Sequence, residues 1–295
     1  MTFGEKLKSI RKRAQMSQEK LAEKLGVSRQ AITKWETDMG MPEIENLMAI
    51  SALFDLSLDE LLSGQKDVAE KTDYLFESVT EYDIDGPKRY DLKLGAAKRI
   101  VLSGYDGEKI HVRLVSDTLA TLQSDLKIGI DDVRNRIDVD INRRNGMTDA
   151  AAKEAVSIFV KIPSKYIMEI GLEVNAETVE LASLTCDRIE LEVKTQNILL
   201  EDVVGCVEID CNLDMKVVCR PLKGEIAINQ LKATSRICIP EGTNFAAVTK
   251  GIGTSISIDK GGSRLEPVDP KEADNIIELN GLKSELIISA LDQGE

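Results

Sequence analysis

The second half of the chain carries a repeat of about 19 residues, and this spacing limits its fold more than any other feature. Alternating segments such as Ile-Glu-Leu-Glu-Val recur at steps of 19, 18 and 19 residues, and a second series lies between them at steps of 19, 19 and 20. Two short strands per turn over four turns predict a β-solenoid, in which each coil buries its inward side chains on its neighbours. An ordinary β-sandwich with coincidental spacing is the alternative. The first series begins at Ile170, Ile189, Val207 and Ile226, and the second at Val179, Ile198, Val217 and Ile237.

The composition agrees with a narrow β interior. Aromatic residues make up only 4% of the chain, so aliphatic side chains must fill its core. We therefore predict an all-β, right-handed β-solenoid-like domain over residues 91–295.

The cysteines give no sign of a metal or redox site. There are five of them, without a Cys-x-x-Cys pair, and the chain has a single histidine, His111. We expect no metal and no cofactor, and we interpret the cysteines as small buried residues in a reducing cytoplasm. Cys219 and Cys238 fall at matching positions of the second series, which predicts that both point into the solenoid interior. The other three are Cys186, Cys206 and Cys211.

Segments on either side of the repeat are less regular, as expected for the coils that close a solenoid. Residues 99–115 predict a β-hairpin, and residues 126–144 predict a second pair of strands. Residues 148–166 predict a loop or short helix followed by a strand. The segment 255–291 predicts a strand, a Gly/Pro-rich loop and two closing strands, in keeping with the need to cap the open sheet edge.

The first 64 residues have the helical period instead. Ser17 and Ser28 are N-caps of two short helices, Gly26 ends the first of these, and Pro42 opens another. The segment 57–60 is a capping box for a fifth helix. The chain is thus predicted to consist of an all-α five-helix domain at 1–64, a polar linker at 65–90 and the β-solenoid at 91–295.

The stretch SQEKLAEKLGVSRQAITKWE, residues 17–36, packs two of these helices around one glycine. Ala22 is small enough for the following helix to cross closely, and Gly26 permits a left-handed turn. Ile32 and Trp35 anchor the second helix in the core. With those faces buried, the remaining side chains of that helix must point outward. They are Arg29, Gln30, Thr33 and Lys34.

This stretch, together with MPEIENLMAISALFDLSLDELL, closely resembles the XRE, or phage-repressor, family of helix-turn-helix proteins over residues 3–63. The resemblance implies that the helix at 28–36 enters the DNA major groove, where Arg and Gln side chains can read guanine and adenine. It implies base contacts from Arg29, Gln30, Thr33 and Lys34, phosphate contacts from Gln18 and Ser28, and structural roles for Ala22, Gly26, Ile32 and Trp35.

The β-rich part resembles in pattern the bacterial domains known as "putative adhesin" domains, some of which are fused to small DNA-binding domains. The resemblance covers residues 90–292 and includes no catalytic motif. It implies an assembly or sensing module, without indicating a ligand.

The distribution of charge supports a DNA partner. Residues 1–35 hold nine basic and three acidic residues, whereas residues 36–64 hold seven acidic residues and no Lys or Arg. Such a polarised domain would turn its basic face toward phosphate. Residues 65–295 carry 29 basic and 41 acidic residues, a net charge of −12, so they should point away from the duplex. The simpler alternative is that Arg29, Lys34 and their neighbours are only the solvated side of helices.

These patterns predict a sequence-specific transcriptional regulator, a repressor, that binds double-stranded DNA. Two copies on a pseudo-palindrome would give useful affinity, so we expect a homodimer or higher homo-oligomer, with an exposed β edge or solenoid face as the contact. The alternative is an interaction protein whose solenoid binds a partner protein, with the helical domain only localising it. A protein or ligand partner of the C-terminal domain stays open.

An enzyme is not expected. Autocleaving repressors use a Ser-Met step, and no Ser-Met dipeptide occurs. The most acidic segment contains Asp131, Asp132, Asp138 and Asp140, which fit a solvated edge that discourages aggregation better than a polysaccharide-cleaving groove. With no secretory leader at the N-terminus and no apolar run of about 18 residues, we expect a cytoplasmic, bacterial-type protein without membrane contacts.

Overall fold

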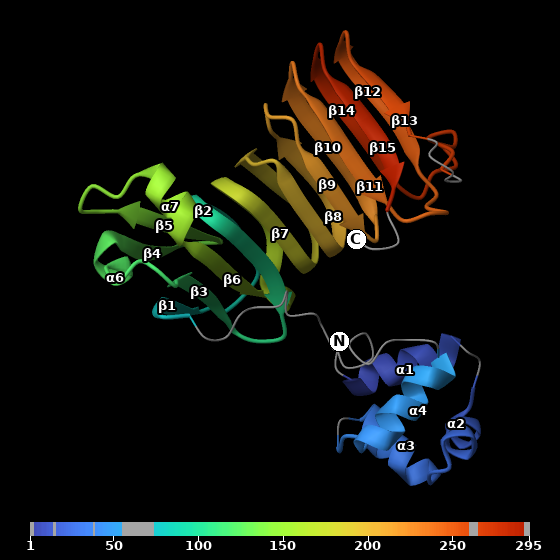
Figure 1. Cartoon of the computed structure of the whole chain (residues 1–295). Helices are drawn as coiled ribbons and strands as arrows, with labels where there is room; N and C mark the ends of the chain where they lie inside the picture. The colour runs from blue at the N-terminus through green and yellow to red at the C-terminus, as the bar shows by residue number, and fades with distance from the viewer. Residues whose placement is uncertain (1–2, 14–15, 38, 55–73, 260–264, 292–295) are drawn as a thin grey trace. The chain divides into compact units, whose positions relative to one another are not determined.

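The computed structural model describes residues 3–13, 16–37, 39–54, 74–259 and 265–291. Contacts divide the chain into two units, Met1–Lys71 and Thr72–Glu295, and each is described by itself (Figure 1). As predicted, a short helical region precedes a large all-β region. None of the helices in these residues has the length and apolar character required to cross a bilayer.

The first unit packs short helices around a small core. Two of them start at serine caps, because the Ser17 and Ser28 hydroxyls each accept a hydrogen bond of 3.1 Å from the N–H three residues on. The predicted fifth helix, at 57–63, lies outside the described residues. The helices are α1 (Phe3–Arg13), α2 (Gln18–Leu25), α3 (Arg29–Glu36) and α4 (Ile44–Phe54). The core consists of Phe3, Leu7, Leu21, Ala22, Ile32, Trp35, Leu47 and Ile50.

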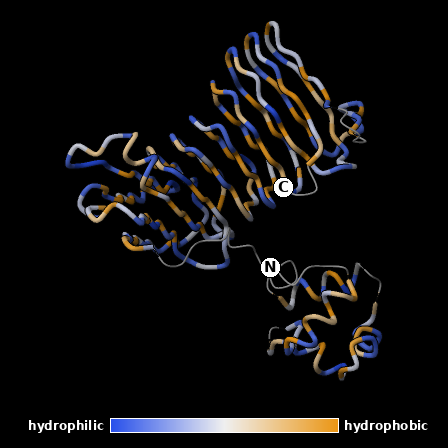
Figure 2. The backbone as a smooth tube through the Cα atoms, viewed as in Figure 1, coloured by the Kyte–Doolittle hydropathy of each residue, from blue (hydrophilic) through white to orange (hydrophobic). Residues whose placement is uncertain are grey.

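Within the part of the second unit that the structure describes, fifteen paired strands form one continuous set. Its strands stack as parallel coils over much of their length, with hydrophobic residues repeating along them (Figures 1 and 2). The strands are β1 (Phe76–Asp83), β2 (Lys88–Tyr105), β3 (Lys109–Ser116), β4 (Leu126–Val133), β5 (Arg136–Arg143), β6 (Ser157–Pro163), β7 (Ile167–Lys194), β8 (Asn197–Asp210), β9 (Lys216–Arg220), β10 (Gly224–Leu231), β11 (Thr234–Ile239), β12 (Ala246–Ile252), β13 (Ser255–Ile258), β14 (Ile276–Leu282) and β15 (Glu285–Ala290). Two short helices, α6 (Leu122–Asp125) and α7 (Asp149–Ala155), accompany them.

The register of the coils follows the sequence repeat. Val179 pairs with Ile198, Ile198 with Val217, and Val217 with Ile237. The first series behaves in the same way, with Ile189 opposite Val207 and Val207 opposite Ile226. These side chains are buried in one continuous aliphatic core, so the spacing reflects coil-on-coil packing.

One prediction drawn from the repeat is wrong by one residue. Between β9 and β11 the step is 20 residues, so Cys238 lies opposite Val218 and not Cys219. A shift of one residue turns a side chain to the other face of a strand. Cys219 belongs to the interior cluster, whereas Cys238 is buried outside that cluster, with its Sγ 3.4 Å from Ser289 Oγ. All five cysteines are free, and Cys186 and Cys206 are only half-buried.

The closing strands do not form the end of the stack. β14 pairs with β10 on one side and β12 on the other, and β15 likewise lies between β11 and β13. The coil formed by residues 276–290 is thus inserted between two coils that precede it in the sequence. The outermost rung is β12 and β13, so the predicted capping role of β14 and β15 is wrong.

The N-terminal end of the β unit also differs from the prediction. Residues 76–83, assigned to a linker, form β1, which pairs antiparallel with β3. The predicted hairpin at 99–115 is absent, because β6 lies between β2 and β3 and pairs with both. The linker was predicted from the polar composition of this segment. Because only one face of β1 is half-buried, most of its residues are polar although it forms a strand. The strand pair at 126–144 forms as β4 and β5.

Two stacked glycines allow the coils to turn closely. Gly224 lies opposite Gly205, with φ of 110° and 135° respectively, and a Cβ on Gly224 would sit 2.3 Å from the Gly205 carbonyl oxygen. Glycine adopts these positive φ values without the steric penalty that a Cβ imposes. A Cβ at this position would also clash with the neighbouring backbone.

Gly224→Ala is therefore expected to destabilise the β unit more than Gly242→Ala. Gly242 also has a positive φ, 74°, but open space surrounds the position of its Cβ. The control should cost ~1–2 kcal/mol from backbone conformation alone, and Gly224→Ala should add ~1–3 kcal/mol of overpacking. Urea unfolding followed by far-UV circular dichroism measures both, and equal losses would show that the close approach is unimportant.

Candidate nucleic-acid interface

The turn between α2 and α3 holds the two helices in close contact. Gly26 ends α2 with φ of 67°, and its N–H donates to the carbonyls of Ala22 and Glu23. Ala22 is buried beneath α3, while Ile32 and Trp35 carry α3 into the core. With Ala22, Ile32 and Trp35 buried and Gly26 in the left-handed conformation, the face of α3 that meets solvent is fixed.

A buried ion pair ties α3 to α1. Arg11 Nε lies 2.5 Å from Glu36 Oε1 and Nη2 lies 2.9 Å from Oε2, in a two-pronged contact. The Glu36 side chain is 1% exposed and the Arg11 side chain 10%. Burial acts to raise the pKa of Glu36, but hydrogen bonds from Arg11 and Gln18 outweigh it and leave the pKa below its ordinary value. The pKa of Arg11 is raised, chiefly by its hydrogen bond to Glu36. Both groups are thus charged at neutral pH.

Gln18 links the start of α2 to the same cluster. Its amide nitrogen donates to Glu36 Oε2 at 2.9 Å, and its amide oxygen accepts from the Thr33 hydroxyl at 3.4 Å. The side chain of Gln18 therefore braces α3 from the first turn of α2. One of the two amide hydrogens of Gln18 is used in this contact.

The predicted reading residues all lie on the exposed face of α3. Arg29, Gln30, Thr33 and Lys34 are exposed, as is the cap residue Ser28. The first turn of α3 has no acidic residue to compensate the positive end of its dipole. The exposed face of α3 therefore carries a cation and an amide in the first turn, beside the helix N-terminus, and a second cation in the last turn. Such a face suits an anionic, hydrogen-bonding surface.

Arg29 is partly engaged. Its Nη1 lies 2.8 Å from Glu19 Oε1, but both side chains are about 60% exposed. Such a solvent-exposed pair contributes little and is easily exchanged for another partner. Gln30 and Lys34 have no side-chain partner among the described residues.

Sequence reasoning did not find the Arg11–Glu36 pair. The two residues are 25 positions apart, on different helices, and both read as ordinary surface charges. No sequence signal marks the pair, because the burial of Glu36 follows from the packing of the end of α3 against α1.

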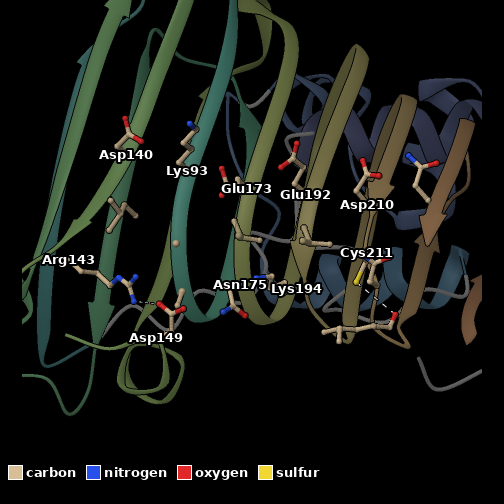
Figure 3. A pocket seen from close by; sticks show the side chains of 18 of the residues that line it. Lys93, Asp140, Arg143, Asp149, Glu173, Asn175, Glu192, Lys194, Asp210 and Cys211 are labelled. Atoms are coloured by element: carbon tan, nitrogen blue, oxygen red, sulfur yellow. Dashed lines mark hydrogen bonds and ion pairs between the residues drawn. The ribbon is translucent and has the colours of Figure 1, made fainter. Parts of the chain in front are cut away.

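The β unit carries a polar groove of about 1000 Å³ on the outer face of its coils (Figure 3). Lys93 lies opposite both Asp140 and Glu173, and Glu192 lies opposite Asp210, so charged side chains form a row across successive strands. Among the described residues, no group of His, Cys, Asp and Glu is arranged to hold a metal ion.

The acidic segment of β4 and β5 does not form one cluster. Asp132 accepts from Lys88 Nζ at 2.9 Å, and Asp138 pairs with Arg136 at 2.7 Å. Of the four aspartates only Asp140 lines the groove. Ion pairing along a solvated strand accounts for Asp132 and Asp138.

Comparison with known proteins matches the helical unit. A helix-turn-helix family model matches residues 7–61. The HTH-type transcriptional activator BcrR of Enterococcus faecalis is 50% identical over 66 residues, which are 22% of this chain and 32% of BcrR. The uncharacterised HTH-type transcriptional regulator YqaE of Bacillus subtilis is 33% identical over 88 residues, which are 30% of this chain and 72% of YqaE. The match to BcrR thus spans only about a third of that protein's own length.

The β unit has a solved structural neighbour of low similarity. The crystal structure of a "putative cell adhesion protein" from Clostridium sporogenes matches 73% of this chain and 99% of its own, with 10% identity and a TM-score of 0.40. The resemblance of the first unit, by contrast, rests on shared sequence. The chain belongs to the family of helix-turn-helix transcriptional regulators.

Proposed function

We propose that the protein is a sequence-specific repressor that reads the DNA major groove with α3. The observation that carries this proposal is the exposed face of α3, held in place by the buried seam of Ile32 and Trp35 and by the Arg11–Glu36–Gln18 cluster. A reading helix must be rigid, because hydrogen bonds to base edges depend on the position of each donor.

The dimensions and chemistry of α3 fit the groove. An α-helix with its side chains is about 10–12 Å in diameter, which a major groove about 12 Å wide can admit. Arg29 is assigned to the O6 and N7 of a guanine and Gln30 to the N6 and N7 of an adenine. Lys34 and Thr33, farther along the helix, contact a base or the backbone, and Ser28 and the second amide hydrogen of Gln18 contact phosphates.

The β unit is proposed to assemble copies of the protein. One helix-turn-helix unit reads a single half-site, and two copies with centres about 34 Å apart read a pseudo-palindrome. A net charge of −12 over residues 65–295 would keep the β unit from adding phosphate contacts. The free state of all five cysteines suits a reducing cytoplasm, where such a regulator would meet DNA.

Selection of bound duplexes from random oligonucleotides tests this function. We expect an enriched site with two related half-sites about 10 base pairs apart. Binding to that site should weaken linearly on a logarithmic salt scale, because each neutralised phosphate releases counterions. Enrichment of no sequence, or affinity for random DNA equal to that for the selected site, would overturn the proposal.

A further inference from the structure

Among the described residues, one edge of the β unit carries fewer charges than its other edges. β12 and β13 form the outermost rung at one end of the coil stack (Figure 1). The edge strands elsewhere, β1 and β4, each carry three charged residues in eight. β13 is Ser-Ile-Ser-Ile, without a charge, and β12 carries only Lys250. Charges on an edge oppose pairing with another chain, so this edge is the one least protected against pairing.

The single lysine of this edge is neutralised within the unit. Lys250 Nζ lies 2.5 Å from Glu278 Oε2, and Glu278 is on the neighbouring strand β14. An approaching strand would therefore meet an ion pair of no net charge. Lys250 gives the edge little of the repulsion that an unpaired lysine provides.

Backbone groups of β12 point outward from the stack. The N–H of Ala246 donates to the Asn275 carbonyl, and the Ile252 carbonyl accepts from the N–H of Lys283, both at 2.9 Å. Even-numbered residues of β12 therefore bond to β14. In a parallel ladder the alternate residues face the other way, so Ala247, Thr249 and Gly251 present their N–H and C=O groups to solvent.

The chain itself shows that this row of groups accepts a further segment. Phe245, one step before Ala247 in the outward series, takes a hydrogen bond of 2.9 Å on its carbonyl from the N–H of Val268. The outward-facing carbonyl at position 245 is therefore already hydrogen-bonded within the chain. The outward groups at 247, 249 and 251 have no partner among the described residues.

An exposed apolar ridge leads to the same edge. Leu231 lies opposite Leu282, and Leu282 lies opposite Ile252, so the three follow one another over three rungs. Their exposed fractions are 47%, 38% and 75%, the largest at the edge itself. Contiguous exposed apolar side chains mark interaction surfaces.

We propose that a second copy of this chain pairs with β12 across a two-fold axis, adding strand to strand. The choice of a second copy rests on the proposed function, which requires two helix-turn-helix units on one operator. A two-fold contact brings the same edge from both copies, and the two β12 strands then run antiparallel. Ile252 of each copy packs beside the β12 strand of the other.

Sedimentation of the full-length chain tests this contact. Thr249→Pro removes one outward N–H while leaving the bonds to β14 intact, and Thr249→Val keeps that N–H as a matched control. Ile252→Lys replaces a three-quarters exposed side chain with a charge at the ridge. We expect wild type and Thr249→Val to sediment as dimers, and Thr249→Pro and Ile252→Lys to sediment as monomers with unchanged circular dichroism.

Two results would overturn the proposal. One is a wild type that sediments as a monomer at every concentration. The other is a dimer formed by folded Thr249→Pro or, where that variant does not fold, by Ile252→Lys.

Failure of the proposed function is measured separately. The variants leave α3 untouched, so their affinity for one half-site should equal that of wild type, while affinity for a duplex with two half-sites falls at least ~100-fold. Wild type that dimerises without selecting a DNA site would overturn the repressor role and leave the edge contact standing.

Discussion

Arg11→Met is expected to destabilise the helical unit by ~3–5 kcal/mol, because it leaves the buried Glu36 carboxylate without its cation. The pair contributes little as an isolated attraction, since both charges lost their water on folding. Removal of one partner exposes that cost. Trp35 is the only tryptophan of the chain and is buried in this unit, so its fluorescence follows unfolding of the helical unit in the intact protein.

The effect should depend on pH in a defined direction. In the wild type the pKa of Glu36 is lowered on folding, so its contribution is complete above the ordinary glutamate pKa of about 4.3 and is lost as pH falls through the lowered value. In Arg11→Met burial dominates, and the pKa of Glu36 should rise above its unfolded value. Protonation then removes the penalty, so the gap between variant and wild type should narrow as the solution is acidified.

A double variant provides the control. Arg11→Met with Glu36→Leu removes both charges and should recover most of the stability, because an apolar pair of similar volume often replaces a buried ion pair without loss. The contrary result is that Arg11→Met lowers the free energy of unfolding by less than about 1 kcal/mol, with a difference from wild type that does not change on acidification. That result would show that the pair does not constrain α3.

Arg29→Ala combined with Gln30→Ala should lower affinity for the selected DNA site by ~2–6 kcal/mol, or roughly 30-fold or more. Each change removes a side chain assigned to two base-edge hydrogen bonds. Affinity for random DNA should fall much less, so the ratio of specific to non-specific binding should collapse. Titration of both duplexes by fluorescence anisotropy at fixed salt gives this ratio.

Lys20→Ala and Lys24→Ala are matched controls on α2. Both residues are exposed, and neither lies on α3. Their loss should reduce specific and non-specific binding by similar factors, because a lysine near phosphate senses charge and not sequence. If the α3 double variant behaves like these two, base reading by Arg29 and Gln30 is wrong.

The repeat of the β unit could be predicted because each coil contacts its nearest neighbours at an almost constant step. The pairing register can therefore be predicted from the spacing of Ile189, Val207 and Ile226. The insertion of β14 and β15 has no such local signal. Parallel strands are paired through space, and nothing in the sequence of 276–290 indicates that the coil enters between two earlier ones. The false hairpin at 99–115 has the same origin, because β6 displaces the neighbour expected from chain order.

The helical unit was predictable where one helix face determines the next. Once Ile32 and Trp35 are inward, Arg29, Gln30 and Lys34 must be outward, and the structure places them so. The Arg11–Glu36 pair was not predictable by that reasoning. Charged residues are ordinarily assigned to the surface, and only the three-dimensional closeness of α1 and the end of α3 brings this pair into the core.

The late coil has a consequence for synthesis. A ribosome releases residues 246–258 before residues 276–290, yet the earlier rung can dock only on the later one. Until β14 and β15 have been synthesised, β12 and β13 lack the strands with which they pair in the folded protein. During that time the stack ends at β10 and β11. The β12 edge therefore cannot form in its folded position before residues 276–290 have been synthesised. Association of two copies through this edge is delayed until then.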